Sequence, residues 1–272
     1  MTKEVFDASW LALREPVDHR SRAGALLPLL KVVWRRRHWS QVVDLGSGTG
    51  SNLRYLGSSL PDGQVWTLVD HDPDLLERAT APDRVKGLSR VCGDVADAGL
   101  ELVEDADLVT GSALLDLVSE EWLRTLAEAC RQAACGVLFA LSYDGAIAWN
   151  GEGVEEDPVD ILTRDAVNAH QRRDKGLGPA LGPTAGPVAR TLFEHVGYRT
   201  WFLPSPWRLD RRDSVLAGAL VDGWERAALE ESPVLRDRIR EWAERRRQRV
   251  ASGEFELTVG HVDLLALPDE SL

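Results

Sequence analysis

A glycine-rich segment that follows a short apolar run constrains the fold of this chain more than any other feature. Residues 41–56 read QVVDLGSGTGSNLRYL, and the β-branched pair near its start is typical of a buried parallel strand. Three glycines then alternate with small side chains: Gly46, Ser47, Gly48, Thr49 and Gly50. Because glycine has no Cβ, the backbone can turn sharply here and a ligand can lie against it. The segment predicts a strand, a tight turn and a helix that begins near Ser51.

Two common nucleotide-binding motifs fit this turn poorly. The dinucleotide fingerprint G-x-G-x-x-G requires a third glycine where this chain has Ser51. A P-loop requires a Gly-Lys-Ser/Thr sequence, and the turn contains no lysine. A turn without any ligand is disfavoured, since three glycines lose conformational entropy when they become ordered.

The composition narrows the class of partner. The 272-residue chain has a net charge of −12, and phosphate contacts need surplus Lys and Arg, so we expect no nucleic-acid partner. Neither a signal peptide nor an apolar run of about 18 residues is present, so we expect a cytoplasmic protein with no membrane partner. The three cysteines form no C-x-x-C pair and no metal-ligand spacing appears, so we expect no metal.

Predicted strands and helices alternate regularly up to Ser142, which is typical of a doubly wound parallel α/β sheet. The second strand ends at Asp70, about twenty residues past the glycines, where a carboxylate can accept from both ribose hydroxyls of an adenosine. Asp72 is the alternative for this role, and His71 would lie beside the ribose. Ser112 follows the fourth strand, at the edge where open α/β sheets bind ligands.

The run VVDLGSGTG resembles the first motif of the class I S-adenosylmethionine (SAM) dependent methyltransferases. The resemblance implies a seven-stranded Rossmann-like sheet with six parallel strands and an antiparallel last strand. It also implies SAM as cofactor and S-adenosylhomocysteine (SAH) as product, with the glycines facing the methionine part of SAM. The cofactor-binding residues that we expect are Arg22, Asp44, Gly46, Ser47, Gly48, Gly50, Asn52, Asp70, His71, Asp94, Val95 and Ser112.

With this resemblance the chain divides into four predicted parts. A helical N-terminal cap, residues 1–40, is broken at Pro16 and folds over the cofactor. The SAM-binding core is residues 41–142, and residues 143–185 are an acceptor-binding lid inserted after the fifth strand. Residues 186–272 complete the sheet and add two helices.

The segment 143–183 breaks the alternation and is too long for an ordinary loop, so we expect it to be functional. Because arginine recognises carboxylate and phosphate through its planar fork, the basic residues at 170–175 predict a small anionic acceptor. A solvated loop with salt bridges is the alternative. The candidate general bases are His170, then Tyr143 and His71. The candidate acceptor-binding residues are Asp116, Trp149, Arg172, Arg173 and Lys175.

The resemblance therefore predicts a SAM-dependent methyltransferase, of the EC 2.1.1 type, that acts on a small molecule. Three alternatives stay open: an enzyme that transfers another group from SAM or cyclises it, a nicotinamide-dependent oxidoreductase, and a non-catalytic SAM-binding protein. The chain lacks an (Asn/Asp)-Pro-Pro-(Tyr/Phe) motif after the fourth strand, which disfavours exocyclic amino groups of bases as acceptors. We expect a small-molecule acceptor as partner, and a homodimer stays open.

Overall fold

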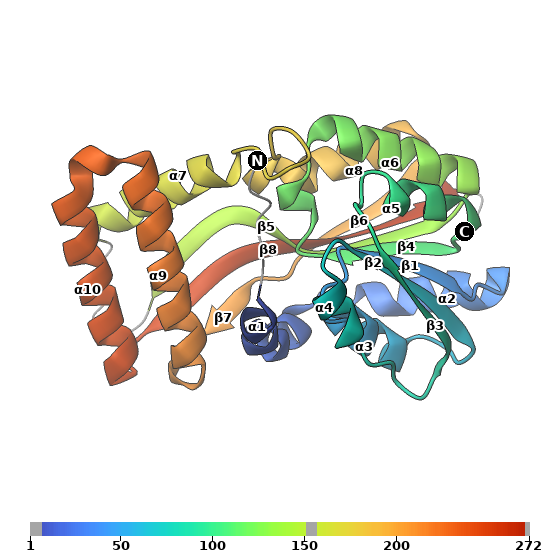
Figure 1. The fold of residues 1–272 in the computed structure, drawn as a ribbon, viewed down its shortest axis with the longest axis horizontal. Coiled ribbons are helices and arrows are strands. Elements are labelled where there is room, and N and C mark those ends of the chain that lie inside the picture. Colours follow the sequence, from blue (N-terminus) through green and yellow to red (C-terminus); the bar gives the residue numbers. More distant parts are fainter. Residues whose placement is uncertain (1–6, 151–156, 270–272) are drawn as a thin grey trace.

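The computed structural model describes residues 7–150 and 157–269. Within these ranges the strands form a single mixed sheet (Figure 1). The strands are β1 (Gln41–Leu45), β2 (Gln64–Asp70), β3 (Val85–Cys92), β4 (Leu108–Ser112), β5 (Gly136–Asn150), β6 (Tyr198–Pro204), β7 (Trp207–Leu209) and β8 (Glu256–Pro268). The helices are α1 (Ala8–Ser21), α2 (Leu26–Arg37), α3 (Ser51–Ser59), α4 (Pro73–Glu77), α5 (Ala98–Glu101), α6 (Glu120–Ala133), α7 (Pro158–Gln171), α8 (Ala185–His195), α9 (Ser214–Glu231) and α10 (Arg236–Ser252).

The sheet has the strand order β3-β2-β1-β4-β5-β8-β6. The pairs from β3 to β5 are parallel, and β8 lies antiparallel between β5 and β6. This confirms the doubly wound Rossmann-like sheet with an antiparallel last strand. The described part of the chain has eight strands rather than the expected seven, because the short β7 also pairs with β8. No helix in the described residues is long and apolar enough to cross a membrane.

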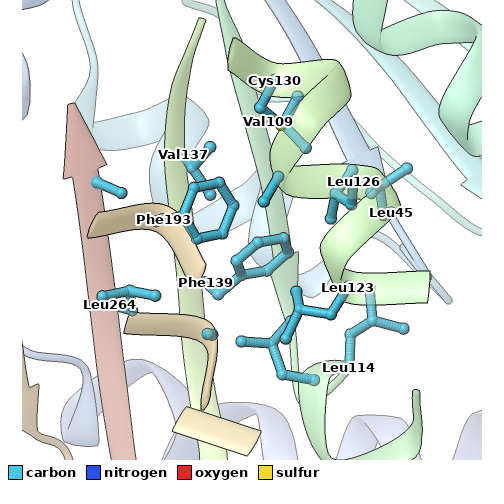
Figure 2. Close-up of a cluster of buried hydrophobic side chains, with 14 of the residues drawn as sticks. Leu45, Val109, Leu114, Leu123, Leu126, Cys130, Val137, Phe139, Phe193 and Leu264 are labelled. Carbon is cyan, nitrogen blue, oxygen red and sulfur yellow. The ribbon is translucent and has the colours of Figure 1, made fainter. Parts of the chain in front are cut away.

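Helices cover both faces of the sheet, with α2 and α3 on one face and α6 and α8 on the other (Figure 1). Helix α6 begins because the Ser119 Oγ accepts from the N–H of Trp122, and it ends at Ala134, which adopts a left-handed conformation. Apolar side chains recur along α6 at helical spacing and face the sheet. Figure 2 shows them meeting Phe139 of β5 and Phe193 of α8 in a fully buried cluster.

Strands β5 and β8 extend well past the parallel part of the sheet, toward α7, α9 and α10 (Figure 1). The sequence prediction of an irregular segment from residue 143 was wrong here, because β5 continues to Asn150 and α7 is a regular 14-residue helix. The buried and exposed positions alternate along 143–150, with Tyr143 and Trp149 facing inward. This period of two is a strand signal that was present in the sequence.

The N-terminal helices also differ from the expectation. Helix α1 continues through Pro16, and the break between α1 and α2 comes later, at residues 22–25. Asp7 begins α1, because its carboxylate accepts from the N–H groups of Ser9 and Trp10. The continuous helix is what carries Leu11 and its neighbours over the glycine turn.

The Asp263 carboxylate of β8 accepts hydrogen bonds from three separate segments of the chain. The side chain is 2 % exposed. Its Oδ1 accepts from the N–H of Leu141 at 2.8 Å and from the Ser205 hydroxyl at 2.6 Å. Its Oδ2 accepts from the N–H of Ala23 at 2.9 Å and lies 3.4 Å from Arg22 Nε. Asp263 therefore joins a bulge in β5, the β6–β7 connection and the α1–α2 junction.

We predict that Asp263→Asn lowers the free energy of unfolding by about 2–4 kcal/mol, because an amide NH₂ would face buried donors that now share a carboxylate. Urea unfolding followed by circular dichroism measures this. Asp62→Asn is the matched control, since the Asp62 side chain is 80 % exposed, and should change stability by less than about 0.5 kcal/mol. Equal midpoints for the two variants would contradict the role given to Asp263.

Candidate active site

A cavity of about 180 Å³ opens at the carboxyl ends of β1, β2 and β4, and we call it the glycine-turn cavity. It lies where the strand order of a doubly wound sheet reverses, which is the usual ligand site of such folds. Its lining residues are Leu11, Arg14, Asp18, Asp44, Gly46, Ser47, Gly48, Thr49, Ser51, Asn52, Asp70, His71, Asp72, Leu75, Asp94, Val95, Ser112, Ala113, Leu114, Leu117, Lys175, Gly176 and Leu177.

The glycine turn uses its own N–H groups within the protein. The N–H of Ser47 donates to the Val69 carbonyl at 3.1 Å, and the N–H of Gly50 donates to the Ser47 carbonyl at 2.9 Å. The N–H of Gly48 donates to Asp70 Oδ2 at 2.7 Å. These three amides are therefore committed, and the turn differs from a phosphate-binding nest, whose amides point at the ligand.

Helix α1 covers the glycine turn. Gly48 has a φ of +51°, and a Cβ at this position would lie 3.0 Å from Leu11 Cδ1. The helix is also tied to α3, because Glu15 forms a two-point ion pair with Arg54. A side chain at Gly48 would thus be strained and would push against the covering helix.

Asp44 lies at the floor of the cavity and is fully buried. Its Oδ1 accepts from Asn52 Nδ2 at 2.8 Å, and the same nitrogen lies 3.0 Å from Thr110 Oγ1. Its Oδ2 is buried without a hydrogen-bond partner among the described residues. Burial raises the pKa of Asp44 to about 7. A cationic donor in the cavity would supply the missing hydrogen bond and favour the charged form.

Arg22 supports this floor from behind. Its Nη1 donates to Asn52 Oδ1 at 2.9 Å, and its guanidinium stacks over the Tyr55 ring at 4.6 Å. The side chain is 4 % exposed and does not line the cavity. Arg22 therefore orients Asn52, which in turn holds Asp44.

Carboxylates outnumber cationic side chains in the lining of the glycine-turn cavity. Its lining includes two cationic side chains, Arg14 and Lys175. It includes five carboxylates: Asp18, Asp44, Asp70, Asp72 and Asp94. A cavity of this sign attracts a cationic ligand and repels a polyphosphate.

The structure brings ten of the twelve residues expected for the cofactor to this one cavity. Those ten are Asp44, Gly46, Ser47, Gly48, Asn52, Asp70, His71, Asp94, Val95 and Ser112. Arg22 and Gly50 are not in the lining. Gly50 instead begins α3 with a φ of +80°, where a Cβ would lie 3.0 Å from Ala79 Cβ, so its role is in the turn.

A second cavity, of about 140 Å³, adjoins the first, and we call it the aromatic cavity. The two share Arg14, Ala113 and Leu117 in their linings. Its full lining is Trp10, Arg14, Ala113, Asp116, Leu117, Leu141, Tyr143, Val167, Gln171, Trp207, Leu220, Trp224, Val259 and His261. Ala113 and Leu141 both adopt left-handed conformations, with φ of +53° and +54°, so strained backbone borders this cavity.

The expected acceptor residues divide between the two cavities and the protein surface. Asp116 and Tyr143 line the aromatic cavity, and Lys175 lines the glycine-turn cavity. Trp149 lines neither, because it packs edge-on against Trp224 and Phe255.

His170, Arg172 and Arg173 also lie outside the two linings. The end of α7 that carries them faces α9. His170 and Arg173 meet Glu230 there, at 3.2 Å and 2.9 Å. Ion pairs within the protein therefore account for His170 and Arg173, whereas Arg172 donates to the Asn168 carbonyl.

His261 and three tryptophans of the aromatic cavity were not predicted as site residues. His261 is 5 % exposed, and its Nδ1 lies 3.0 Å from the Val259 carbonyl. Since a carbonyl only accepts, Nδ1 carries the hydrogen and Nε2 keeps its lone pair. Burial, with the charge of Arg14, lowers the pKa of His261 to about 3, so the ring stays neutral. Sequence spacing alone gave no signal for this cluster.

The surroundings of Tyr143 favour its neutral, protonated hydroxyl. Its hydroxyl donates to Asn168 Oδ1 at 2.8 Å. Burial, with the charges of Asp144 and Asp116, raises the pKa of Tyr143 well above its usual value. Tyr143 is thus a wall of the aromatic cavity and a poor general base near neutral pH.

Comparisons with known proteins agree with this geometry. Residues 42–136 match a family model described as a methyltransferase domain. A cyclopropane-fatty-acyl-phospholipid synthase-like protein from Lactobacillus casei has a similar structure, with a TM-score of 0.52 and 14% identity over 98% of this chain and 96% of that chain. A SAM-dependent methyltransferase from Geobacter sulfurreducens, solved with SAH, gives a TM-score of 0.45 and 17% identity over 97% of this chain and 100% of that chain. No curated protein sequence matches the chain.

Residues 42–136 thus match a methyltransferase domain, and the sheet around them has the strand order of a doubly wound Rossmann-like fold.

We predict that Asp44→Asn changes the pH dependence of stability. The folded protein keeps the Asp44 proton up to about pH 7, whereas an unfolded aspartate with a pKa of 3.8 loses it earlier. The stabilising contribution is therefore fully present below the unfolded pKa and is lost as pH rises through about 7. Relative to Asp44→Asn, the wild type should lose up to about 1.4 kcal/mol per pH unit over this window.

Urea unfolding at several pH values between about 4.5 and 8 gives this difference directly. Carboxyls shared by the two proteins cancel in the comparison. Parallel profiles across this window would show that Asp44 titrates normally and would contradict the prediction.

Proposed function

We propose that the glycine-turn cavity binds SAM and that the aromatic cavity holds a small-molecule acceptor for methyl transfer. The observation that carries this proposal is the buried Asp44 carboxylate at the floor of an acidic cavity, whose Oδ2 has no hydrogen-bond partner within residues 7–150 and 157–269. SAM carries an ammonium and a sulfonium group, so its charge matches such a cavity.

The residues of the cavity fit the parts of SAM in order along the sheet edge. Asp44 would accept from the ammonium of the methionine part, beside Gly46 and Gly48, which also line the cavity. Asp70, at the end of β2, would accept from the ribose hydroxyls. Asp94 and Val95 would meet the adenine, the first by a hydrogen bond and the second by packing.

The chain's contribution to the reaction is positioning. SAM, when bound, supplies a methyl group on a sulfonium, from which the neutral thioether SAH leaves readily. The two cavities meet at Ala113 and Leu117, so an acceptor in one lies beside a cofactor in the other. Helix α1 excludes water from the glycine turn and contributes Trp10 and Arg14 to the acceptor side. Proximity and alignment of this kind supply a large part of the rate acceleration in group transfer.

The alternative functions have weaker physical support. A nicotinamide dinucleotide would place a pyrophosphate at a turn whose Ser47, Gly48 and Gly50 amides are committed and whose floor is Asp44. A non-catalytic SAM-binding protein would not need the adjoining aromatic cavity. Transfer of another group from SAM is distinguished by product, since methyl transfer yields SAH and transfer of the aminocarboxypropyl group yields methylthioadenosine.

We predict that the purified protein binds SAM and that Asp44→Asn weakens binding by about 1–3 kcal/mol, about fivefold to 150-fold, because a charge-assisted hydrogen bond is lost. Isothermal titration calorimetry measures both affinities. Asp74→Asn is the control, because Asp74 is exposed on α4 and lies outside the cavity lining. Binding of NAD in preference to SAM would contradict the proposal.

We predict that His170→Ala leaves methyl transfer nearly unchanged, within about twofold, because His170 contacts Glu230 rather than either cavity. The assay is SAH release with any acceptor that the wild type accepts, across the pH range. Tyr143→Phe keeps the ring and removes one hydrogen bond to Asn168, so it should affect the acceptor KM more than kcat. A large loss of kcat in His170→Ala alone would restore His170 as the general base.

A further inference from the structure

We propose that the aromatic cavity selects an amine, carried on a group about the size of one aromatic ring, and that the Asp116 carboxylate receives the proton that the amine releases. This inference rests on the proposed function and names the chemical class of its acceptor.

The size of the cavity sets the size of the group that enters it. Its volume is about 140 Å³. An engineered protein cavity of about 150 Å³ accepts one benzene molecule. The aromatic cavity therefore has room for a single ring or a compact aliphatic group of that size, with the rest of a larger acceptor projecting through its opening.

Arg14, the cationic side chain in the lining of the aromatic cavity, is already paired with the Asp18 carboxylate. Arg14 donates through Nε and Nη2 to Asp18, at 2.8 Å and 3.2 Å, and its guanidinium lies over the Trp207 ring. Trp207 Nε1 donates to the same Asp18 carboxylate at 3.0 Å. This closed arrangement leaves Arg14 committed to Asp18, so it is a poor partner for an anionic acceptor.

Several of the polar atoms that line the cavity are hydrogen-bond acceptors. Gln171 Oε1 is buried without a hydrogen-bond partner among the described residues. His261 Nε2 carries a lone pair, because Nδ1 donates to the backbone, and the Tyr143 hydroxyl hydrogen is used by Asn168. Asp116 adds a carboxylate that is 8 % exposed. An ammonium brings several N–H donors and therefore matches the lone pairs of Gln171 Oε1 and His261 Nε2.

The aromatic lining favours the same ligand charge. Trp10, Trp207, Trp224 and Tyr143 surround the cavity, and His261 lies with its ring centre 4.8 Å from that of Trp207. Aromatic faces attract a cation but give no advantage to a carboxylate. The charge of Asp116, the lone pairs of Gln171 and His261 and the aromatic rings therefore all point to a protonated amine as the bound form.

The chemistry balances with Asp116 as the proton acceptor. An ammonium ion gives one proton to the carboxylate and becomes a neutral amine with a free electron pair. This pair forms the new C–N bond, and the electron pair of the broken C–S bond stays on sulfur. The products are the N-methylated acceptor, as an ammonium ion, and a thioether. The proton on Asp116 returns to solvent when the products leave. His261 orients an N–H group through Nε2 and does not take the proton, because its pKa is too low.

The experiment compares three ligands that share one ring and differ in charge: benzylamine, benzyl alcohol and benzoate. SAH binding to the full chain is measured first by calorimetry, and each probe is then titrated into the protein saturated with SAH. We expect benzylamine to bind at least about tenfold more tightly than the other two. Asp116→Asn should remove this preference and leave SAH affinity unchanged. Glu121→Gln, on the exposed face of α6, is the matched control and should keep the preference.

The outcomes distinguish a failure of the proposed function from a failure of the inference about the acceptor. If SAH does not bind, the proposed function fails. If SAH binds but benzoate or benzyl alcohol binds as tightly as benzylamine, or benzylamine shows no saturable binding at millimolar concentration, only this inference is overturned. An unchanged preference in Asp116→Asn also overturns it. Should that variant fail to fold, the ranking of the three probes on the wild type still decides.

Discussion

The structure of the site depends on one buried carboxylate and the chain of hydrogen bonds that holds it. Arg22 orients Asn52, and Asn52 donates to both Asp44 and Thr110 beneath the glycine turn. Burying a carboxylate without compensation is costly, and in the described part of the chain only one of the two Asp44 oxygens has a hydrogen-bond partner. The raised pKa of Asp44 is the signature of that cost. A cationic ligand completes the arrangement, so folding and ligand charge are linked at this residue.

The same network connects the N-terminal helix to the far strand. Arg22 and Ala23 approach Asp263 of β8, and Asp263 also holds the left-handed Leu141 of β5. Leu141 lines the aromatic cavity, whereas Asn52 lines the glycine-turn cavity. The α1–α2 junction therefore touches supports of both cavities. Any movement of α1 that admits a ligand would act on these hydrogen bonds, which ties access to the site to the packing of the covering helix.

Local sequence patterns were enough for the sheet and for the glycine-turn cavity. The glycine spacing, Asp44 and Asp70 all lie within one strand–turn–helix–strand unit, where spacing along the chain translates directly into spacing at the sheet edge. The aromatic cavity is different, because its walls come from α1, β5, β7, α9 and β8, and no local signal joins these segments. The basic residues near His170 stand out in the sequence by their charge, but no local pattern shows that His170 and Arg173 contact Glu230 of α9, about sixty positions away. Along residues 143–150 a period-two pattern was present but was obscured by Gly145 and the polar residues around it.

A crystal structure of the protein with SAH tests the central claim most directly. The account predicts SAH in the glycine-turn cavity, with its amino group within hydrogen-bond distance of Asp44 Oδ2 and its ribose hydroxyls on the Asp70 carboxylate. It also predicts that the sulfur atom points toward Ala113 and Leu117, where the two cavities meet. SAH bound elsewhere, or bound with its amino group away from Asp44, would contradict the claim that a buried carboxylate beneath three glycines defines this site.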